Sequence, residues 1–208
     1  MFEFWNKPWW TIWTQTRSTI RLLLENSYSI RWGLLFVPLF GISMTLNQVS
    51  FSEYGDWYTL SRLLIVSLPK GLGIGWIIWL VYGTLFWSVG RLFGGEGVWK
   101  DMLLALAWAT VPHTANLILW FLRILCFGEE TFTLYTPTIN SSLTLLSLYI
   151  IFWFLDVVLT IWYFIILIKS VSEVHGFSSW KGAGVVFLSL TLLWIVLKYV
   201  FGFVLMPF

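Results

Sequence analysis

The stretch IIFWFLDVVLTIWYF, residues 150–164, is almost wholly apolar, yet it carries a single carboxylate, that of Asp156, near its middle. It lies inside an apolar run over residues 143–168, which is longer than the roughly 20 residues that a helix needs to cross a bilayer core. The run therefore predicts a membrane-spanning helix. Because a charge at mid-bilayer costs roughly 2.5–3.5 kcal/mol, we expect Asp156 to face other helices and to have a partner there.

The composition of the whole chain places it in the same class. Of the 208 residues, 59% are hydrophobic and only 11% are charged, and the mean hydropathy is +0.83, which is typical of an integral membrane protein. Sixteen Trp fit the aromatic belts that form at the two membrane interfaces. A net charge of +2 argues against a nucleic-acid partner, and the single Cys126 cannot form an internal disulfide or a cysteine metal cluster.

Five apolar runs are long enough to cross a bilayer, and they lie over residues 32–49, 63–93, 102–127, 143–168 and 182–208. We therefore expect an all-α integral membrane fold, with a five-transmembrane-helix bundle over residues 30–208. Small residues four apart allow two helices to approach closely in lipid. This spacing predicts helix-packing positions, which are Gly71, Gly75, Gly90, Gly94, Ala105 and Ala109.

Residues 1–29 form a separate unit before the first span. The stretch PWWTIWTQTRSTIRLLLEN, residues 8–26, places Trp9 and Trp13 on one apolar face of a helix and Arg17 and Arg21 on its flank. This pattern predicts an interfacial amphipathic helix that lies in the plane of the cytoplasmic membrane surface. A soluble helix packed against the end of the bundle is the alternative interpretation.

The distribution of Lys and Arg between the short loops predicts the orientation of the chain, because cytoplasmic loops carry an excess of these residues. One side collects eight cations, which are Lys7, Arg17, Arg21, Arg31, Arg91, Lys100, Lys169 and Lys181. The other side has four, which are Arg62, Lys70, Arg123 and Lys198. We therefore expect a multi-pass protein of the cell membrane with its N-terminus in the cytoplasm and its C-terminus outside.

Polar side chains inside the spans predict an intramembrane polar site. On the third span, His113 and Asn116 continue the face of the two alanines, and on the fourth, Thr160 shares the face of Asp156. The predicted site comprises Asp156, His113, Asn116, Thr160 and Lys198. His113 matches Asp156 in depth, so we expect it to be the nearest ionisable neighbour of Asp156, with Lys198 as the second candidate. The site is either a structural staple that fixes helix order or a proton- or headgroup-responsive site.

Three segments resemble, in order and spacing, the bacterial branch of the Yip family, whose domain is also called the Ypt/Rab-interacting-protein membrane domain. They are WTIWTQTRSTIR (residues 10–21), GRLFGGEGVWKDMLLALAWATVP (residues 90–112) and IKSVSEVHGFSSWKG (residues 168–182). The resemblance implies a five-helix membrane domain with a cytoplasmic N-terminus and no established catalytic residues. Eukaryotic members are associated with vesicle-trafficking membranes and small GTPases, a role that does not transfer to bacteria. Some bacterial relatives look like companions of ABC-type exporters.

The sequence lacks the motifs of the common enzyme classes, such as H-E-x-x-H, G-x-S-x-G or a phosphate-binding loop. We expect a non-enzymatic protein without a metal or cofactor, acting as a partner subunit or membrane-organising factor in a bacterial cytoplasmic membrane. The expected partners are the lipid bilayer and other membrane proteins, or a second copy in a homo-oligomer. The alternative is a small transporter or lipid scramblase that uses an intramembrane polar site around Asp156, His113 and Lys70.

Overall fold

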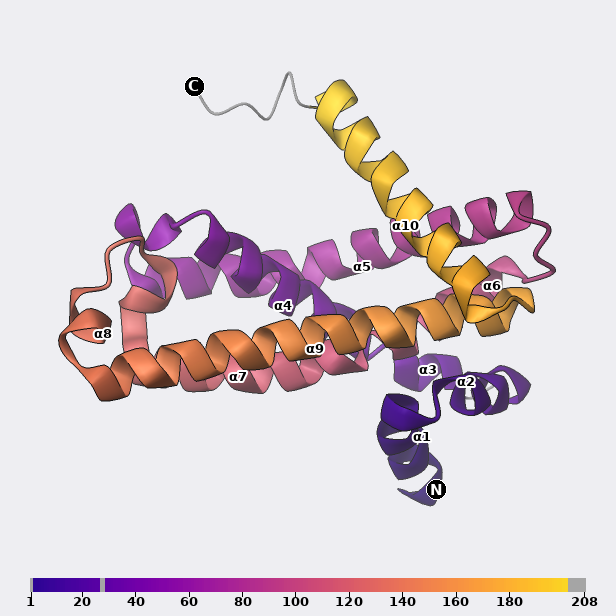
Figure 1. Cartoon of the computed structure of the whole chain (residues 1–208), viewed down its shortest axis with the longest axis horizontal. Helices are drawn as coiled ribbons and strands as arrows, with labels where there is room; N and C mark the ends of the chain where they lie inside the picture. The colour runs from indigo at the N-terminus through magenta and orange to yellow at the C-terminus, as the bar shows by residue number, and fades with distance from the viewer. Residues whose placement is uncertain (1, 27–28, 202–208) are drawn as a thin grey trace.

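The computed structural model describes residues 2–26 and 29–201, and this part of the chain consists of helices joined by short turns. Most of the elements are α-helices (Figure 1): α1 (Phe2–Thr14), α2 (Thr16–Glu25), α3 (Ser29–Gly33), α4 (Phe36–Phe51), α5 (Leu60–Leu92), α6 (Trp99–Ala109), α7 (Val111–Phe127), α8 (Pro137–Ser141), α9 (Leu143–His175) and α10 (Ser179–Val196). Three short helical turns complete them: η1 (Tyr54–Asp56), η2 (Gly128–Phe132) and η3 (Leu197–Phe201). The described residues contain no β-strand.

Five helical segments are long and apolar enough to cross a membrane, so the predicted all-α membrane fold is confirmed. They are Ile30–Phe51, Leu60–Leu92, Trp99–Phe132, Leu143–His175 and Ser179–Tyr199. The third of them is two helices, α6 and α7, which meet at Thr110 just before Pro112. Proline lacks the backbone N–H that a continuing helix would need, so the segment breaks there. Residues 202–208 of the predicted fifth span lie outside the described part.

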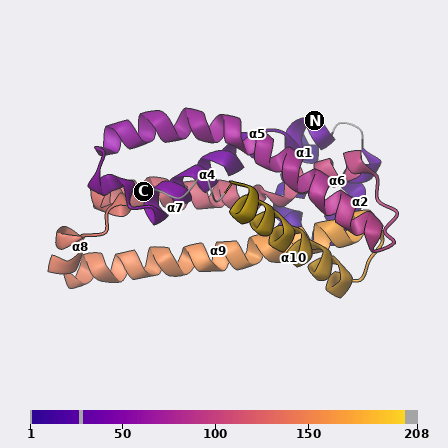
Figure 2. The ribbon, with the colours of Figure 1, turned by 90° about the horizontal axis from the view of Figure 1, so that it is seen from above.

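The long helices lie side by side in the order α5, α4, α7, α9 (Figure 2). α6 packs against α5 and α9, and its Ala105 and Ala109 are fully buried. α10 begins beside the end of α9 and then leans away, so that its far end stands apart from the other helices (Figure 1). The bundle is therefore closed around α4, α6 and α7, and open on the side of α10.

Glycines set the contact between α4 and α5. A Cβ atom at Gly41 would overlap the carbonyl oxygen of Gly71, and one at Gly75 would lie 2.5 Å from the carbonyl oxygen of Val37. Side chains larger than hydrogen would force the two backbones apart. Gly71 and Gly75, which the sequence pointed to, thus meet a third glycine, Gly41, on the neighbouring helix.

The second glycine pair behaves differently. Gly90 packs against the imidazole of His175 at the end of α9, where a Cβ would overlap the ring. Gly94 was expected to pack against a helix, and this prediction is wrong. It lies past the end of α5 with a φ of +78°, and a Cβ there would have no heavy atom within 4 Å. Its role is to turn the chain, because glycine adopts positive φ at no steric cost.

The N-terminal unit is two helices where the sequence suggested one. α1 and α2 are separated at Gln15 and run in different directions (Figure 1). α2 packs against α9 and α6, and its Ile20 and Leu23 are completely buried. On α1, the ring of Trp9 lies 5.3 Å from that of Phe36 at the start of α4. The apolar face that we predicted for the membrane surface therefore also contacts the bundle.

Candidate functional site

Asp156 forms an ion pair with Arg123 across the antiparallel helices α7 and α9. The distance between Arg123 Nη2 and Asp156 Oδ2 is 2.6 Å, and the two side chains are 11% and 20% exposed. The same nitrogen donates a hydrogen bond of 2.8 Å to the carbonyl oxygen of Phe152, one turn before Asp156. The guanidinium also lies 5.2 Å from the ring centre of Trp120 on its own helix. The carboxylate charge is thus neutralised inside the bundle, as the cost of a lone buried charge requires.

The second oxygen of Asp156 is also satisfied. Asn116 donates its amide N–H to Asp156 Oδ1, and its own carbonyl oxygen accepts a hydrogen bond of 3.0 Å from the hydroxyl of Ser43 on α4. Ser43 Oγ lies 3.1 Å from Nδ1 of His113. These five residues, which we name the polar chain, link three helices in the order His113, Ser43, Asn116, Asp156 and Arg123.

The direction of the hydrogen bonds determines the tautomer of His113. Ser43 has one O–H, and it is used toward Asn116. The hydroxyl oxygen can then only accept from His113, so Nδ1 carries the proton of the imidazole. Nε2 is buried and has no hydrogen-bond partner in the described part of the chain. The polar chain therefore starts at a histidine that donates from Nδ1, and it ends at a charge pair.

The prediction that His113 is the nearest ionisable neighbour of Asp156 is wrong, because Arg123 holds that place. The ring of His113 packs edge-on against Tyr163 at 4.6 Å and Phe40 at 4.7 Å, measured between ring centres. The register of the α7–α9 pair explains this. It places Tyr163 beside His113, and it places Asp156, about two turns nearer the start of α9, beside Asn116. The similar depth of His113 and Asp156 in their spans, on which the prediction was based, does not determine this register.

Two other predicted members lie apart from the polar chain. Thr160 is on an exposed part of α9. Lys198 is exposed in η3, just beyond α10, with its ammonium 4.9 Å from the ring centre of Trp194 and 5.7 Å from that of Tyr199. Within the described residues, neither makes a hydrogen bond or an ion pair with the polar chain, so the prediction that they belong to the site is corrected. The lean of α10 away from the bundle removes Lys198 from reach.

Sequence reasoning missed Arg123 and Ser43. Arg123 was counted with the external loop cations because it lies near the end of an apolar run. A signal was present, since Asn116, Trp120 and Arg123 are spaced by four and three residues and so share one helix face. Ser43 carried no such signal, because a lone hydroxyl in an apolar helix is common.

The two arginines predicted for the membrane surface form a second polar cluster, at the end of the bundle where α9 turns into α10. Arg21 pairs with Glu173 at 2.7 Å, and Arg17 lies 3.7 Å from the same carboxylate. Arg17 also donates to the carbonyl oxygen of Phe177 at 2.8 Å. Together these contacts hold α2 against the end of α9.

A further bond ties α1 to the bundle: the indole N–H of Trp162 on α9 donates to the carbonyl oxygen of Trp13 at 2.9 Å. α1 and α2 are therefore both fixed to α9 by polar contacts. Within the described residues, no group of three or more His, Cys, Asp or Glu side chains is placed to hold a metal ion.

Comparison with known families gives one match. The family model described as the Yip1 domain matches residues 10–200, which is most of the chain. This range includes α2, all the residues of the polar chain and the whole of α10. No curated protein and no solved structure matches the chain.

Proposed function

Because the chain belongs to the Yip1-domain family and has five membrane-competent helices, we propose that it acts by binding other membrane proteins. It would serve as a non-enzymatic partner subunit or membrane-organising factor in a bacterial cytoplasmic membrane. Domains of this family are not known as enzymes. An ABC-type exporter is one candidate for the partner.

The observation that favours this proposal over a transport function is the complete pairing of Asp156 within the polar chain. Both oxygens of Asp156 have partners, and its charge is neutralised by Arg123. A transport path would need an ionisable group that water or a substrate can reach, whereas a structural staple needs paired groups between helices. The pairing of α7 with α9 through Asp156 and with α4 through Ser43 supports the staple.

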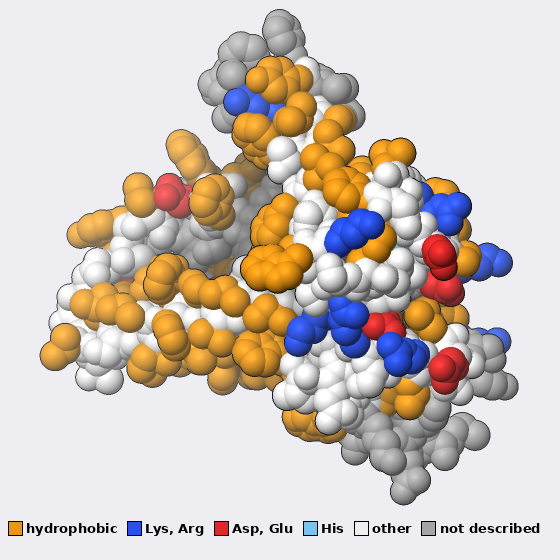
Figure 3. Space-filling view, turned by 45° about the vertical axis from the view of Figure 1, so that its right-hand side comes forward, with side chains coloured by type: hydrophobic (Ala, Val, Ile, Leu, Met, Phe, Trp, Pro, Cys, Tyr) orange, Lys and Arg blue, Asp and Glu red, His pale blue; other side chains and the backbone are white. Residues whose placement is uncertain are grey.

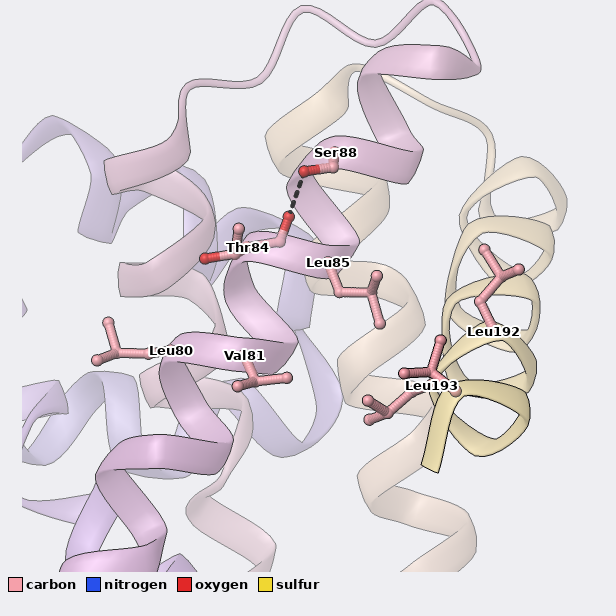
Figure 4. Close-up of a pocket in the computed structure, with 8 residues that line it drawn as sticks. Leu80, Val81, Thr84, Leu85, Ser88, Leu192 and Leu193 are labelled. Carbon is pink, nitrogen blue, oxygen red and sulfur yellow. Dashed lines mark hydrogen bonds between the residues drawn. The ribbon is translucent and has the colours of Figure 1, made fainter. Parts of the chain in front are cut away.

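The surface proposed for the partner is an apolar groove between α5 and α10 (Figure 4). It has a volume of about 500 Å³ and is lined by Leu80, Val81, Thr84, Leu85, Ser88, Leu192, Leu193 and Val196. Ser88 donates its hydroxyl to the carbonyl oxygen of Thr84 at 2.8 Å, so this polar group needs nothing from an occupant. Both helices that line the groove, α5 and α10, are long and apolar enough to span a membrane, and they diverge from each other. We propose that it receives a transmembrane helix of a partner protein.

Site-specific photo-crosslinking in native membranes tests this proposal. A photoreactive residue at Leu193, inside the groove, should crosslink to one membrane protein, and one at Ile161, exposed on α9, should not. The same partner should be lost when Leu85→Trp fills the groove. Adducts with a second copy of the chain, with lipid alone, or equally from both positions would contradict the proposal.

The two N-terminal helices are proposed to lie at the cytoplasmic interface, in contact with both the bundle and the lipid headgroups. The observation that supports this placement is the exposure of Trp10. Its side chain on α1 is 66% exposed, whereas the neighbouring Trp9 packs against the bundle. A nitroxide attached to Trp10→Cys should report the depth of the headgroup boundary by its accessibility to oxygen. A label at Glu25→Cys, at an exposed polar position at the end of α2, should report water. Equal accessibility of the two labels would contradict this placement.

The alternative function, a small transporter or lipid scramblase, has less support. It requires Lys70 to share a path with Asp156 and His113. Lys70 instead lies on an exposed face of α5 and lines a separate hollow with Tyr58 and Arg62.

A further inference from the structure

A basic hollow lies where the junction of α1 and α2 faces α9. It has a volume of about 420 Å³ and is lined by the polar side chains of residues 14–16 and 18 and by three cations, Arg17, Arg21 and Lys169. The cations come from two elements that are far apart in the sequence. Sequence analysis named the two arginines for the membrane surface and did not connect them with Lys169.

Positive charge is in excess at this hollow. The carboxylate of Glu173 engages the two arginines. Lys169 has no ion pair or hydrogen bond among the described residues. The side-chain hydroxyl of Thr14 and the side-chain amide of Gln15, which also line the hollow, add hydrogen-bond donors. An anion with several acceptor oxygens, such as a phosphate diester, matches this chemistry.

The depth of the hollow points to a lipid as the source of that phosphate. The exposed face of α9 is apolar at Ile161 and Ile165, which are 55% and 37% exposed, and Lys169 follows one turn later. The four residues from Ile165 to Lys169 correspond to about 6 Å along the helix. The indole of Trp162, half-exposed, lies at the same level as the apolar positions. The hollow therefore sits directly above a lipid-facing surface, where hydrocarbon gives way to headgroups.

We propose that this hollow binds the phosphate of an anionic phospholipid, whose acyl chains lie along the exposed face of α9. Lys169 contacts the phosphate from α9, and Arg17 and Arg21 contact it from α2. The lipid then bridges the N-terminal helices and the bundle. This inference does not depend on the groove between α5 and α10.

Native mass spectrometry of the full chain, released from detergent, tests this site. Binding of phosphatidylglycerol is compared with that of phosphatidylcholine carrying the same acyl chains. Lys169→Gln should weaken phosphatidylglycerol binding about fivefold, as expected for one cation near a lipid surface. Lys100→Gln, an exposed cation at the start of α6, is the matched control and should leave binding unchanged. Lys169→Arg keeps the charge and should retain binding.

The choice of Lys169 keeps the test separate from folding, because the Arg21–Glu173 pair is untouched. Equal binding of phosphatidylglycerol by Lys169→Gln and the parent chain would overturn the proposal. So would equal binding of both lipids by the parent. If excess inorganic phosphate displaces phosphatidylglycerol from the parent as effectively as added lipid does, the hollow is a site for a soluble anion and the lipid assignment fails.

Discussion

At the scale of single residues, Asp156 divides its two oxygens between different partners. Arg123 supplies a charge and Asn116 a neutral amide, from positions seven residues apart on α7. The arginine is further anchored by the carbonyl oxygen of Phe152, so it cannot follow the carboxylate without losing a second bond. This double attachment makes the charge pair a strong determinant of how α7 and α9 align.

The charge pair predicts a specific pattern of stability. Asp156→Asn removes the negative charge and leaves Arg123 buried without compensation, which costs about 3–5 kcal/mol. The double variant Asp156→Leu with Arg123→Leu should recover much of this loss, because no charge is stranded. The free energy of unfolding in bilayers or mild detergent, measured by steric trapping, checks both. Thr160→Val, at an exposed position on the same helix, should change stability by less than about 0.5 kcal/mol.

The outcome also separates the two interpretations of the site. An Asp156→Asn chain as stable as the parent would mean that the acid is protonated and the charge pair absent. Loss of partner binding in step with loss of folded protein is the result expected for a staple.

Ser43 is the second residue whose substitution should lower the stability of the protein. Ser43→Ala deletes the hydroxyl that joins His113 to Asn116, and it leaves a buried N–H and a buried carbonyl oxygen without partners. We expect a loss of about 1–3 kcal/mol in the free energy of unfolding. Ser147→Ala, on an exposed position of α9, is the control and should be close to neutral. A neutral Ser43→Ala would show that the polar chain is not continuous at α4.

At the scale of elements, the contact of α4 with α5 depends on the absence of side chains. Three glycines, Gly41, Gly71 and Gly75, bring the two backbones together, and each would place a Cβ into the other helix. Close backbone approach increases packing in lipid, where helices gain no hydrophobic drive from association. The contact with α5 fixes the position of α4. In this position Ser43 on α4 is within hydrogen-bond distance of Asn116 on α7.

The glycine contact predicts opposite effects for two substitutions of the same type. Gly41→Ala should destabilise the protein by about 1–3 kcal/mol, because the new methyl group meets backbone atoms that cannot move aside. Gly73→Ala, on the exposed face of α5 with no heavy atom within 4 Å of the new Cβ, should be neutral or stabilising. Thermal unfolding of the two variants in the same detergent compares them. Equal stabilities would show that the helices are not in contact at Gly41.

At the scale of the whole molecule, charge is distributed unevenly between the two ends of the bundle. Lys, Arg, Asp and Glu side chains gather near α2 and the α9–α10 turn, while hydrophobic side chains cover the flanks of the long helices (Figure 3). Arg123, which the sequence count assigned to the external side, is paired with Asp156 inside the bundle. Three cations are then left in the count for that side. The asymmetry in basic residues is therefore larger than the sequence count suggested, and it supports a cytoplasmic N-terminus.

This orientation predicts the labelling of introduced cysteines in intact cells. Ser141→Cys, on exposed α8, should react with an impermeant thiol reagent, and Ser178→Cys, in the exposed α9–α10 turn, should be protected until the membrane is opened. Both variants need a Cys126→Ser background, because the native thiol is exposed in the structure. The reverse pattern would place the N-terminus outside.

The spans, their helical form and the small-residue contacts of α5 could be read from the sequence alone. The free energy of inserting a helix into a bilayer is a sum of contributions from consecutive residues. The composition of a short stretch of sequence is therefore enough to predict a span. Likewise Asp156 had to face other helices, because its penalty in lipid depends only on its own charge.

The tertiary structure alone decided which partner Asp156 has. That choice depends on the register of α7 against α9, on the position of α4 and on the lean of α10, none of which is a local property. A shift of two turns along α9 is enough to exchange Arg123 for His113 as the neighbour. The same holds at the basic hollow, where Lys169 and the two arginines meet only because α2 folds back onto α9.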